Sequence, residues 1–289
     1  MKTGFAGLGV MGAPMARHLL GAGHAVTGYN RSPDKARAWA EANGGTFAGT
    51  VAEAAAGAEL FVLCVGNDDD VRQVVAEALP HLAKGAVIVD HTTTSAKVAR
   101  EMADLATGQG AFFIDAPVSG GQAGAENGQL SVMAGGDADA LSRVEAAVMS
   151  YSKAIKHMGP SGAGQLTKMA NQICIAGVVQ GLAEAVHFAR SAELDTDAVL
   201  DAISKGAAQS WQMDNRWKTM ARGEFEFGFA VDWMRKDLGL VLDEARANGS
   251  HLALTALVDQ FYSEVQAMGG ARWDTSSLAA RLQDRKPGG

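Results

Sequence analysis

The chain has 289 residues, of which 35 are glycine, 47% are hydrophobic and 6% are aromatic. A chain this apolar is not intrinsically disordered, its glycines follow no collagen period, and its length is typical of two domains. With 25 basic and 32 acidic residues the net charge is −7, and no basic block interrupts the sequence. We therefore expect neither nucleic acid nor a membrane as a partner, since the uninterrupted apolar runs are also too short for a bilayer.

The two cysteines and seven histidines show no spacing that suits a metal site. Cys64 and Cys174 lie in apolar stretches, and we expect both to be buried thiols in a reducing compartment. The apolar N-terminus imitates a secretory signal, but three glycines and Pro14 would break the helix that a signal needs. The sequence thus predicts a metal-free, cytoplasmic protein.

In the first half of the chain, short β-branched runs alternate with helical patterns. Strands are expected at residues 3–6, 25–29, 60–65, 86–90, 112–115, 130–134 and 154–158. The helices expected between them include residues 11–22, 33–41 and 95–105. This alternation is typical of the α/β class and predicts parallel strands joined by right-handed crossovers, a Rossmann-type doubly wound sheet.

The second half of the chain has a purely helical pattern. One long helix is expected over about 165–192, followed by helices at 196–204, 231–247, 253–268 and 275–282. A turn-rich run at 159–164 favours a boundary near residue 162. We predict an NADP-binding domain over 1–162 and an all-helical substrate and dimerisation domain over 163–289, entered through the long helix. Its apolar length favours a homodimer or homotetramer, and the tail Lys286–Gly289 is expected to fray.

A glycine-rich turn follows the first expected strand and opens a helix. Gly7 permits the tight turn, Gly9 lets a pyrophosphate approach the backbone, and Gly12 lets the helix pack on the strand. The alternative is a glycine-rich turn of another kind of α/β protein. We predict that the phosphates of a dinucleotide lie on the amides of this helix start, and the cofactor-binding residues expected here are Gly7, Leu8, Gly9, Val10, Met11 and Gly12.

The end of the second expected strand bears on the choice between NAD and NADP. An NAD site usually has an acid there, but this chain reads Asn30, Arg31, Ser32, with no carboxylate before Asp34. The Arg31 guanidinium can bind a 2′-phosphate with two hydrogen bonds, and Ser32 can add a hydroxyl. The alternative is a solvated loop arginine. The sequence favours NADP, with NAD as a second cofactor.

Four motifs of this sequence carry a resemblance to a known family. They are the glycine turn with its extension to Ala16 and the segments at residues 115–128, 162–172 and 236–238. Together the four motifs closely resemble the β-hydroxyacid dehydrogenases, which include 3-hydroxyisobutyrate dehydrogenase, tartronate semialdehyde reductase and the glyoxylate/succinic semialdehyde reductases. The resemblance covers nearly the whole chain. It implies a Rossmann domain and an all-helical domain joined by a long helix, in agreement with the expected elements.

The segment Ser119, Gly120, Gly121 offers exposed amides and a hydroxyl, which suit an anion such as a carboxylate. On its own it could be an ordinary turn. The resemblance implies that it holds the carboxylate of the substrate, so the expected partner is a small molecule that bears a carboxylate.

Lys168, Asn171 and Gln172 lie on one face of the expected long helix, at the polar start of an apolar stretch. An isolated helical lysine is usually a solvated charge. The resemblance implies instead that Lys168 is the catalytic general acid/base, which requires a pKa lowered toward neutrality. It further implies that Asn171 orients the substrate. Many relatives have two asparagines here, so Gln172 departs from the pattern while still offering an amide for the substrate.

By resemblance, Lys236 reaches the nicotinamide and Phe229 lines that pocket, although Lys236 could instead form a surface ion pair with Asp232. Thr93 follows the fourth expected strand, where crevices at a strand switch point form and the family contacts the cofactor. A second loop in a matching place, after the third expected strand, adds the predicted cofactor contacts Val65, Gly66 and Asn67. We assign no catalytic role to His91, and Trp211 and Trp233 are more typical of a core than of a pocket.

The sequence thus predicts an NAD(P)-dependent oxidoreductase that interconverts a small β-hydroxy acid and its aldehyde or semialdehyde by hydride transfer. Two alternatives remain at this point. One is an NADPH-dependent imine or ketone reductase of the same fold, although related imine reductases usually replace the catalytic lysine. The other is a non-catalytic NADP-binding protein. The absence of a Gly-x-Ser-x-Gly motif gives no support to an acyl-enzyme hydrolase.

Overall fold

The computed structural model describes residues 1–283, so the expectation for Lys286–Gly289 lies outside the described residues. The chain divides into two compact units, the first Met1–Lys168 and the second beginning at Met169. The division falls inside a long helix, α8 (Ala163–Ser191), six residues beyond the boundary near 162 that the turn-rich run predicts.

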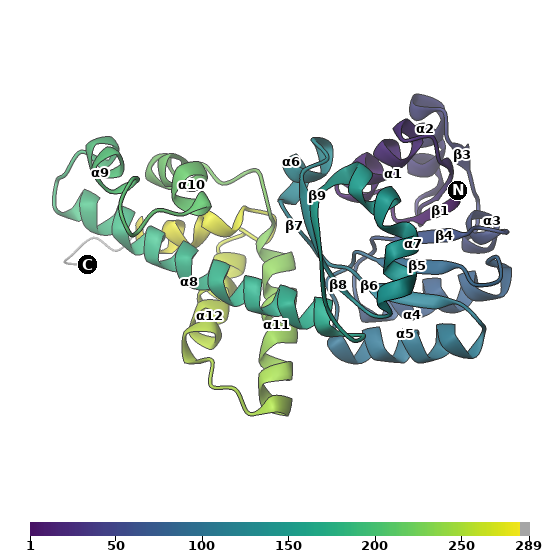
Figure 1. Cartoon of the computed structure of the whole chain (residues 1–289). Helices are drawn as coiled ribbons and strands as arrows, with labels where there is room; N and C mark the ends of the chain where they lie inside the picture. Colours follow the sequence, from purple (N-terminus) through teal and green to yellow (C-terminus); the bar gives the residue numbers. More distant parts are fainter. Residues whose placement is uncertain (284–289) are drawn as a thin grey trace. The chain divides into compact units, whose positions relative to one another are not determined.

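One nine-stranded sheet runs through unit 1, in the order β3-β2-β1-β4-β5-β6-β8-β7, and β9 pairs with β8 (Figure 1). The strands are β1 Lys2–Ala6, β2 Ala25–Tyr29, β3 Thr46–Phe47, β4 Leu60–Leu63, β5 Val87–Asp90, β6 Phe112–Asp115, β7 Val118–Ser119, β8 Leu130–Gly135 and β9 Ser152–Gly159. Because β1 lies between β2 and β4, the strand order reverses there. In open α/β sheets such a switch point forms a ligand crevice at the carboxyl ends of the strands.

The expectation of an entirely parallel sheet is wrong beyond β6. β8 runs antiparallel to both β6 and β7, and only β9 is parallel to it. The reason lies in the connections, since β7 returns to β8 through one short helix, α6 (Gly121–Glu126), and a short connection joins antiparallel strands. β3 and β7 were not expected, because two residues carry no measurable alternation.

Helices cover both faces of the sheet. On one face, Met15 and Leu19 of α1 pack in the same buried cluster as Val144 of α7, and on the other Val75 of α4 packs with Met102 of α5. These helices are α1 Gly12–Gly21, α2 Pro33–Asn43, α3 Val51–Ala55, α4 Asp68–Ala78, α5 Ala96–Gly108 and α7 Ala138–Val148. The arrangement confirms the predicted Rossmann-type doubly wound fold.

Unit 2 is helical, which confirms the other half of the predicted fold class. After α8 it contains α9 Thr196–Ile203, α10 Trp211–Arg222, α11 Val231–Asn248, α12 Ala253–Ala267, a 3-10 turn Thr275–Ala279 and α13 Ala280–Gln283. α10 was not predicted from the sequence, because its signals are its ends rather than its periodicity: Ser210 caps the Met213 amide, and Gly223 ends the helix in a left-handed conformation. Its Trp217 is fully buried in the core of unit 2.

By length and composition alone, α8 is apolar enough to cross a membrane. The same composition suits the central helix of a helical unit, and Ala176, Val179 and Ala183 of α8 are buried in the core of unit 2. Cys174 lies on another side of this helix and is exposed, so the expectation that both thiols are buried is wrong. Cys64 is partly buried.

Candidate active site

The glycine turn between β1 and α1 fits the approach of a pyrophosphate. Gly7 has a φ of +99°, and a Cβ there would lie 2.1 Å from the Cys64 carbonyl oxygen, while a Cβ on Gly12 would lie 1.9 Å from the Gly7 oxygen. A Cβ on Gly9 would meet nothing within 4 Å, so the backbone is open where the phosphates are predicted. α1 begins without a side-chain cap among the described residues. The Ala13 amide donates to the Gly9 carbonyl oxygen and Pro14 has no amide hydrogen, so a phosphate would meet the amides of the turn before Ala13 and the positive end of the helix.

At the end of β2, the Asn30 Oδ1 accepts a hydrogen bond from the Leu8 amide at 3.1 Å and thereby fastens the glycine turn to this strand. The side chain of Arg31 is 90% exposed, and its Nη1 lies 3.7 Å from Asp70 Oδ1. Ser32 is exposed at the start of α2 and makes no side-chain cap with the described residues. The structure therefore leaves Arg31 and Ser32 at the surface, close to the glycine turn in unit 1.

The loops after β4 and β5 are joined by hydrogen bonds. The Val65 amide donates to Thr92 Oγ1 at 3.0 Å, and the Gly66 amide donates to Asp70 Oδ2 at 3.1 Å. Asn67 Oδ1 accepts from the Asp70 amide and so caps α4. Thr93 follows Thr92, so these hydrogen bonds bring together the two loops that the sequence predicts to contact the cofactor.

Lys168 lies beside the predicted carboxylate-binding turn. The residue is 8% exposed, and its Nζ donates to the Val118 carbonyl oxygen at 2.9 Å, one residue before Ser119. Gly120 has a φ of +130°, a conformation that suits glycine, and both it and Gly121 are exposed. The alternative of a solvated surface lysine is thus wrong, and the structure brings Lys168 and the turn together within unit 1.

The start of α8 is held by a buried carboxylate, Asp115, whose two oxygens accept from the Gly162 amide at 2.7 Å and the Gln165 amide at 2.9 Å. Desolvation raises the pKa of Asp115 above its usual value, and the backbone hydrogen bonds oppose that rise. From the sequence, Asp115 is only the first residue of the motif at 115–128. Its capping role depends on a contact between residues 47 positions apart.

In unit 2, four polar residues form a chain of contacts. The side-chain Nδ2 of Asn171 donates to Gln172 Oε1 at 2.8 Å, and Gln172 Nε2 donates to Asp237 Oδ2 at 2.7 Å. Lys236 Nζ lies 3.2 Å from Asp237 Oδ1, so its ion pair in the structure is with Asp237. Asp232, the partner considered from the sequence, accepts a hydrogen bond from Gln266. Asp237 is buried and was missed as a site residue, because its spacing from Gln172 carries no helical signal.

Phe229 is 39% exposed in unit 2, and its amide donates to Asp274 Oδ2 at 2.9 Å. Asp274 is itself buried and pairs with Arg216 at 3.0 Å. Trp211 and Trp233, more typical of a core from the sequence, are 58% and 42% exposed. Both indoles lie near cations instead, with the Lys236 Nζ 5.9 Å from the centre of the Trp233 ring.

His91 belongs to the interior of unit 1. Its Nδ1 donates to the Ala116 carbonyl oxygen at 2.6 Å, so its Nε2 accepts from the Tyr151 hydroxyl at 2.9 Å. Desolvation lowers the pKa of His91 to about 4. A neutral ring with both nitrogens engaged inside the sheet layer is a structural histidine, in agreement with the absence of a catalytic assignment from the sequence.

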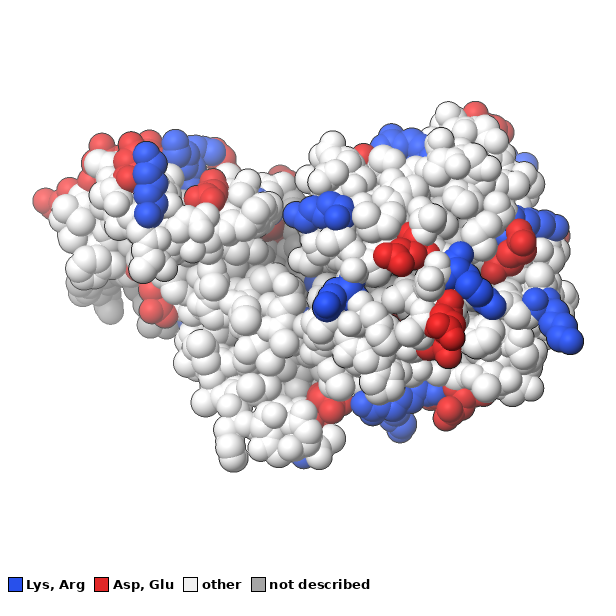
Figure 2. Space-filling view, in the orientation of Figure 1, with Lys and Arg blue, Asp and Glu red and all other residues white. Residues whose placement is uncertain are grey.

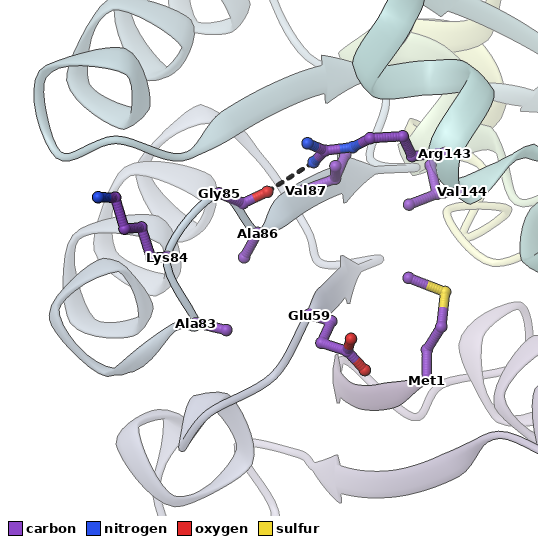
Figure 3. A pocket seen from close by; sticks show the side chains of 9 residues that line it. All are labelled: Met1, Glu59, Ala83, Lys84, Gly85, Ala86, Val87, Arg143 and Val144. Carbon is purple, nitrogen blue, oxygen red and sulfur yellow. Dashed lines mark hydrogen bonds between the residues drawn. The ribbon is translucent and has the colours of Figure 1, made fainter.

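A pocket of about 240 Å³ lies elsewhere in unit 1, where β1, β4 and β5 begin (Figure 3). Glu59, Lys84 and Arg143 are its charged lining residues, and Arg143 donates to the Gly85 carbonyl oxygen. None of the predicted site residues lines it. The pocket lies at the amino ends of the strands, whereas the glycine turn and Thr93 follow their carboxyl ends.

The fold and the glycine turn together indicate a dinucleotide-binding protein, and the family matches define it as a nicotinamide-dependent oxidoreductase. Residues 2–159 match the family of the NAD binding domain of 6-phosphogluconate dehydrogenase, and residues 162–282 match that of the NAD-binding region of NADP-dependent 3-hydroxyisobutyrate dehydrogenase. The chain belongs to the β-hydroxyacid dehydrogenase family.

Individual relatives agree over the full length. An uncharacterized oxidoreductase of Shewanella frigidimarina is 62% identical, with 98% of each chain covered. A probable mitochondrial 3-hydroxyisobutyrate dehydrogenase-like protein of Arabidopsis thaliana is 39% identical over 98% of this chain and 85% of its own. Among solved structures, the 3-hydroxyisobutyrate dehydrogenase of Mycobacterium tuberculosis with L-serine has a TM-score of 0.89 at 32% identity, covering 97% of this chain and 98% of its own.

Proposed function

We propose that the chain is an NADP-dependent 3-hydroxyacid dehydrogenase or reductase, which interconverts a small β-hydroxy acid and its aldehyde or semialdehyde. The observation that carries the proposal is the position of Lys168, whose buried Nζ lies 2.9 Å from the Val118 carbonyl oxygen, one residue before the Ser119–Gly121 turn. A proton donor beside an anion-binding turn is the arrangement that a carboxylate-bearing carbonyl substrate requires.

In this proposal the glycine turn would hold the pyrophosphate of the dinucleotide, whose nicotinamide would supply or accept the hydride when bound. The amides and hydroxyl of Ser119–Gly121 bind the substrate carboxylate, and Asn171 orients the substrate. Lys168 donates a proton from Nζ to the carbonyl oxygen during reduction, which yields the hydroxyl group and a neutral amine. Solvent then reprotonates the amine, and in oxidation the neutral amine removes the hydroxyl proton. Lys236 and Phe229 are proposed to contact the cofactor.

The test is turnover of 3-hydroxyisobutyrate, succinic semialdehyde, tartronate semialdehyde and glyoxylate by wild type and Lys168→Ala. Loss of general acid/base catalysis lowers rates by about 10²- to 10⁴-fold, so we expect kcat to fall by that factor while NADPH binding, followed by its fluorescence, is retained. Full activity in Lys168→Ala would overturn the role of Lys168. Binding of NADPH by wild type without turnover of any member of the panel would favour a non-catalytic nicotinamide-binding protein.

The preference for NADP rests on Arg31, which is exposed near the glycine turn and able to pair with a phosphate. Arg31→Ala should raise the Kd for NADPH by about 10-fold or more, since a charge-assisted hydrogen bond contributes about 1.5–3 kcal/mol. The Kd for NADH should change by less than about 2-fold. Arg17, also exposed on the first helix but not predicted to bind phosphate, provides the matched Arg→Ala control. Equal weakening of both cofactors would contradict the 2′-phosphate role.

We also propose that unit 2 mediates association of identical chains. Val178 and Phe188 of α8 are 39% and 69% exposed, and Leu254 and Leu257 of α12 are 56% and 50% exposed. Leu254 lies against α8, since a Cβ on Gly177 would be 3.3 Å from it. Figure 2 shows a broad area without charged side chains over these two helices. Exposed apolar surface of this kind is typical of subunit interfaces.

A further inference from the structure

Gln165 is a fully buried polar residue in the first turn of α8, and the proposed reaction gives it no role. Its side-chain amide makes two hydrogen bonds to the backbone on either side of Thr93. Nε2 donates to the Thr92 carbonyl oxygen at 2.7 Å, and Oε1 accepts from the Thr94 amide at 3.0 Å. Because this planar amide both donates to and accepts from one tripeptide, it fixes the distance and the orientation of residues 92–94 relative to α8.

The contacts of Gln165 continue in two directions within unit 1. Thr92 Oγ1 accepts from the Val65 amide at 3.0 Å, so the clamped tripeptide also holds the loop after β4. The backbone amide of Gln165 donates to Asp115 Oδ2 at 2.9 Å, which fixes the start of α8 to the end of β6. Gln165 therefore links the predicted cofactor loops to α8 through buried hydrogen bonds.

We propose that Gln165 is a positioning residue that sets the place of the Lys168 amine relative to the cofactor loops. This rests on the proposed function of Lys168. Lys168 is three residues further along the same helix, so any movement of this turn relative to Thr93 also moves the base of the lysine side chain. The Val118 carbonyl holds the amine at the far end. Gln165 acts through Lys168 and does not touch the reacting atoms.

The test compares Gln165→Leu, which keeps the approximate volume but removes both hydrogen bonds, with Gln180→Leu as a matched control. Gln180 is on the same helix and 4% exposed, but among the described residues its side chain bonds to Glu184 of the same helix and to no other segment. Misplacement of a catalytic group by about 1 Å costs up to about 10²-fold in rate. We expect Gln165→Leu to lower kcat by about 10- to 100-fold at an NADPH Kd within about 3-fold of wild type, whereas Gln180→Leu keeps the kcat of wild type.

A double-mutant cycle with Lys168→Ala separates positioning from a general structural effect. In the Lys168→Ala background, Gln165→Leu should lower the remaining rate by less than about 3-fold, because no amine is left to misplace. An equal fold-loss in both backgrounds, or an unchanged kcat in Gln165→Leu alone, would overturn the proposal. Full activity of Lys168→Ala by itself would instead overturn the proposed function, whatever Gln165→Leu does.

A second variant keeps the proposal testable if Gln165→Leu does not fold. Gln165→Glu retains the acceptor for the Thr94 amide and can donate to the Thr92 oxygen only when its carboxyl group is protonated. Its kcat relative to wild type should therefore recover as the pH falls, since burial favours the protonated form. A ratio of kcat values that stays near 1 at every pH would show that the donated hydrogen bond does not position Lys168.

Discussion

Replacing His91 with glutamine should remove much of the acid sensitivity of unit 1. His91 is 2% exposed, and its two ring nitrogens bond the Ala116 carbonyl and the Tyr151 hydroxyl. Desolvation lowers its pKa from 6.5 to about 4, so the folded protein holds the neutral ring where the unfolded chain would already bind a proton. A lowered histidine pKa contributes stability that is fully present above pH 6.5 and is lost as the pH falls toward 4.

The size of the effect follows from this difference in pKa. Each pKa unit corresponds to about 1.4 kcal/mol, so the full contribution of His91 is about 3 kcal/mol, of which about 2 kcal/mol is lost between pH 7.5 and pH 5. At pH 7.5 His91→Gln should be less stable than wild type by about 1–3 kcal/mol, since it disturbs two buried hydrogen bonds. At pH 5 the difference should shrink by about 2 kcal/mol.

The assay is urea-induced unfolding followed by circular dichroism at pH 7.5, 6.5, 5.5 and 5.0, for wild type, His91→Gln and Tyr151→Phe. The Tyr151→Phe variant is the control, because it loses one of the same hydrogen bonds but keeps the titrating ring. Its pH dependence should follow wild type. A difference between wild type and His91→Gln that is constant within about 0.5 kcal/mol across this range would refute the assignment of a neutral, buried His91.

Gly9→Ala adds a methyl group in open space, so it should leave the melting temperature unchanged while weakening NADPH binding about 10-fold or more in fluorescence titrations. In Gly12→Ala the added methyl group meets the backbone of the turn, so this variant should lose about 2 kcal/mol of unfolding free energy. Burial raises the pKa of Asp115, so this group stabilises the folded state below its ordinary pKa of about 4, and that stabilisation is lost as the pH rises. The unfolding free energy of Asp115→Asn, measured in urea, should therefore increase relative to that of wild type from pH 4 to 7. A constant gap would contradict that direction. Phe188→Glu should reduce the molar mass measured by light scattering to that of a single chain, and an unchanged assembly would exclude the apolar face of α8 as its interface.

Much of unit 1 could be predicted from the sequence, because its signals are local. The glycine turn needs only neighbouring residues, and the helices predicted at 11–22, 33–41 and 95–105 correspond to α1, α2 and α5, each of which joins parallel strands. The reversal at β7 and β8 could not be predicted in the same way. It depends on the short return through α6, and a two-residue strand such as Val118–Ser119 has no period to read.

In the candidate site, too, the residues with local sequence signals could be predicted and those that bond distant segments could not. Lys168 and Ser119 lie in motifs that resemble a known family, so their roles could be proposed from the sequence. Gln165 and Asp115 lie in the same motifs, but their function is to bond segments far apart in the chain, 73 positions in the case of Gln165 and Thr92. No periodicity or spacing encodes such a bond. Only the folded sheet, which brings the ends of β5 and β6 to the start of α8, shows what these residues hold.

Helix capping in unit 1 gives an independent argument for where anions bind. Thr50, Asn67, Ser95 and Asp137 each cap their own helix, and Asp115 accepts from the first amides of α8. Among the described residues of unit 1, three α-helices begin without a side-chain cap, namely α1, α2 and α6. α1 begins in the glycine turn, α2 begins directly after Ser32, and α6 begins directly after Gly120.

These three helix starts coincide with the three places where a negative charge is predicted: the pyrophosphate, the 2′-phosphate and the substrate carboxylate. The positive end of the helix dipole favours an anion at an uncapped start. At α2 the dipole would act rather than the first amides, because Pro33 has no amide hydrogen and the Lys35 amide donates to the Ser32 carbonyl oxygen. By contrast, the start of α8 already faces the carboxylate of Asp115, which would repel a second negative charge. This contrast supports the proposal that the substrate carboxylate binds at the Ser119–Gly121 turn and that Lys168, further along α8, handles the proton.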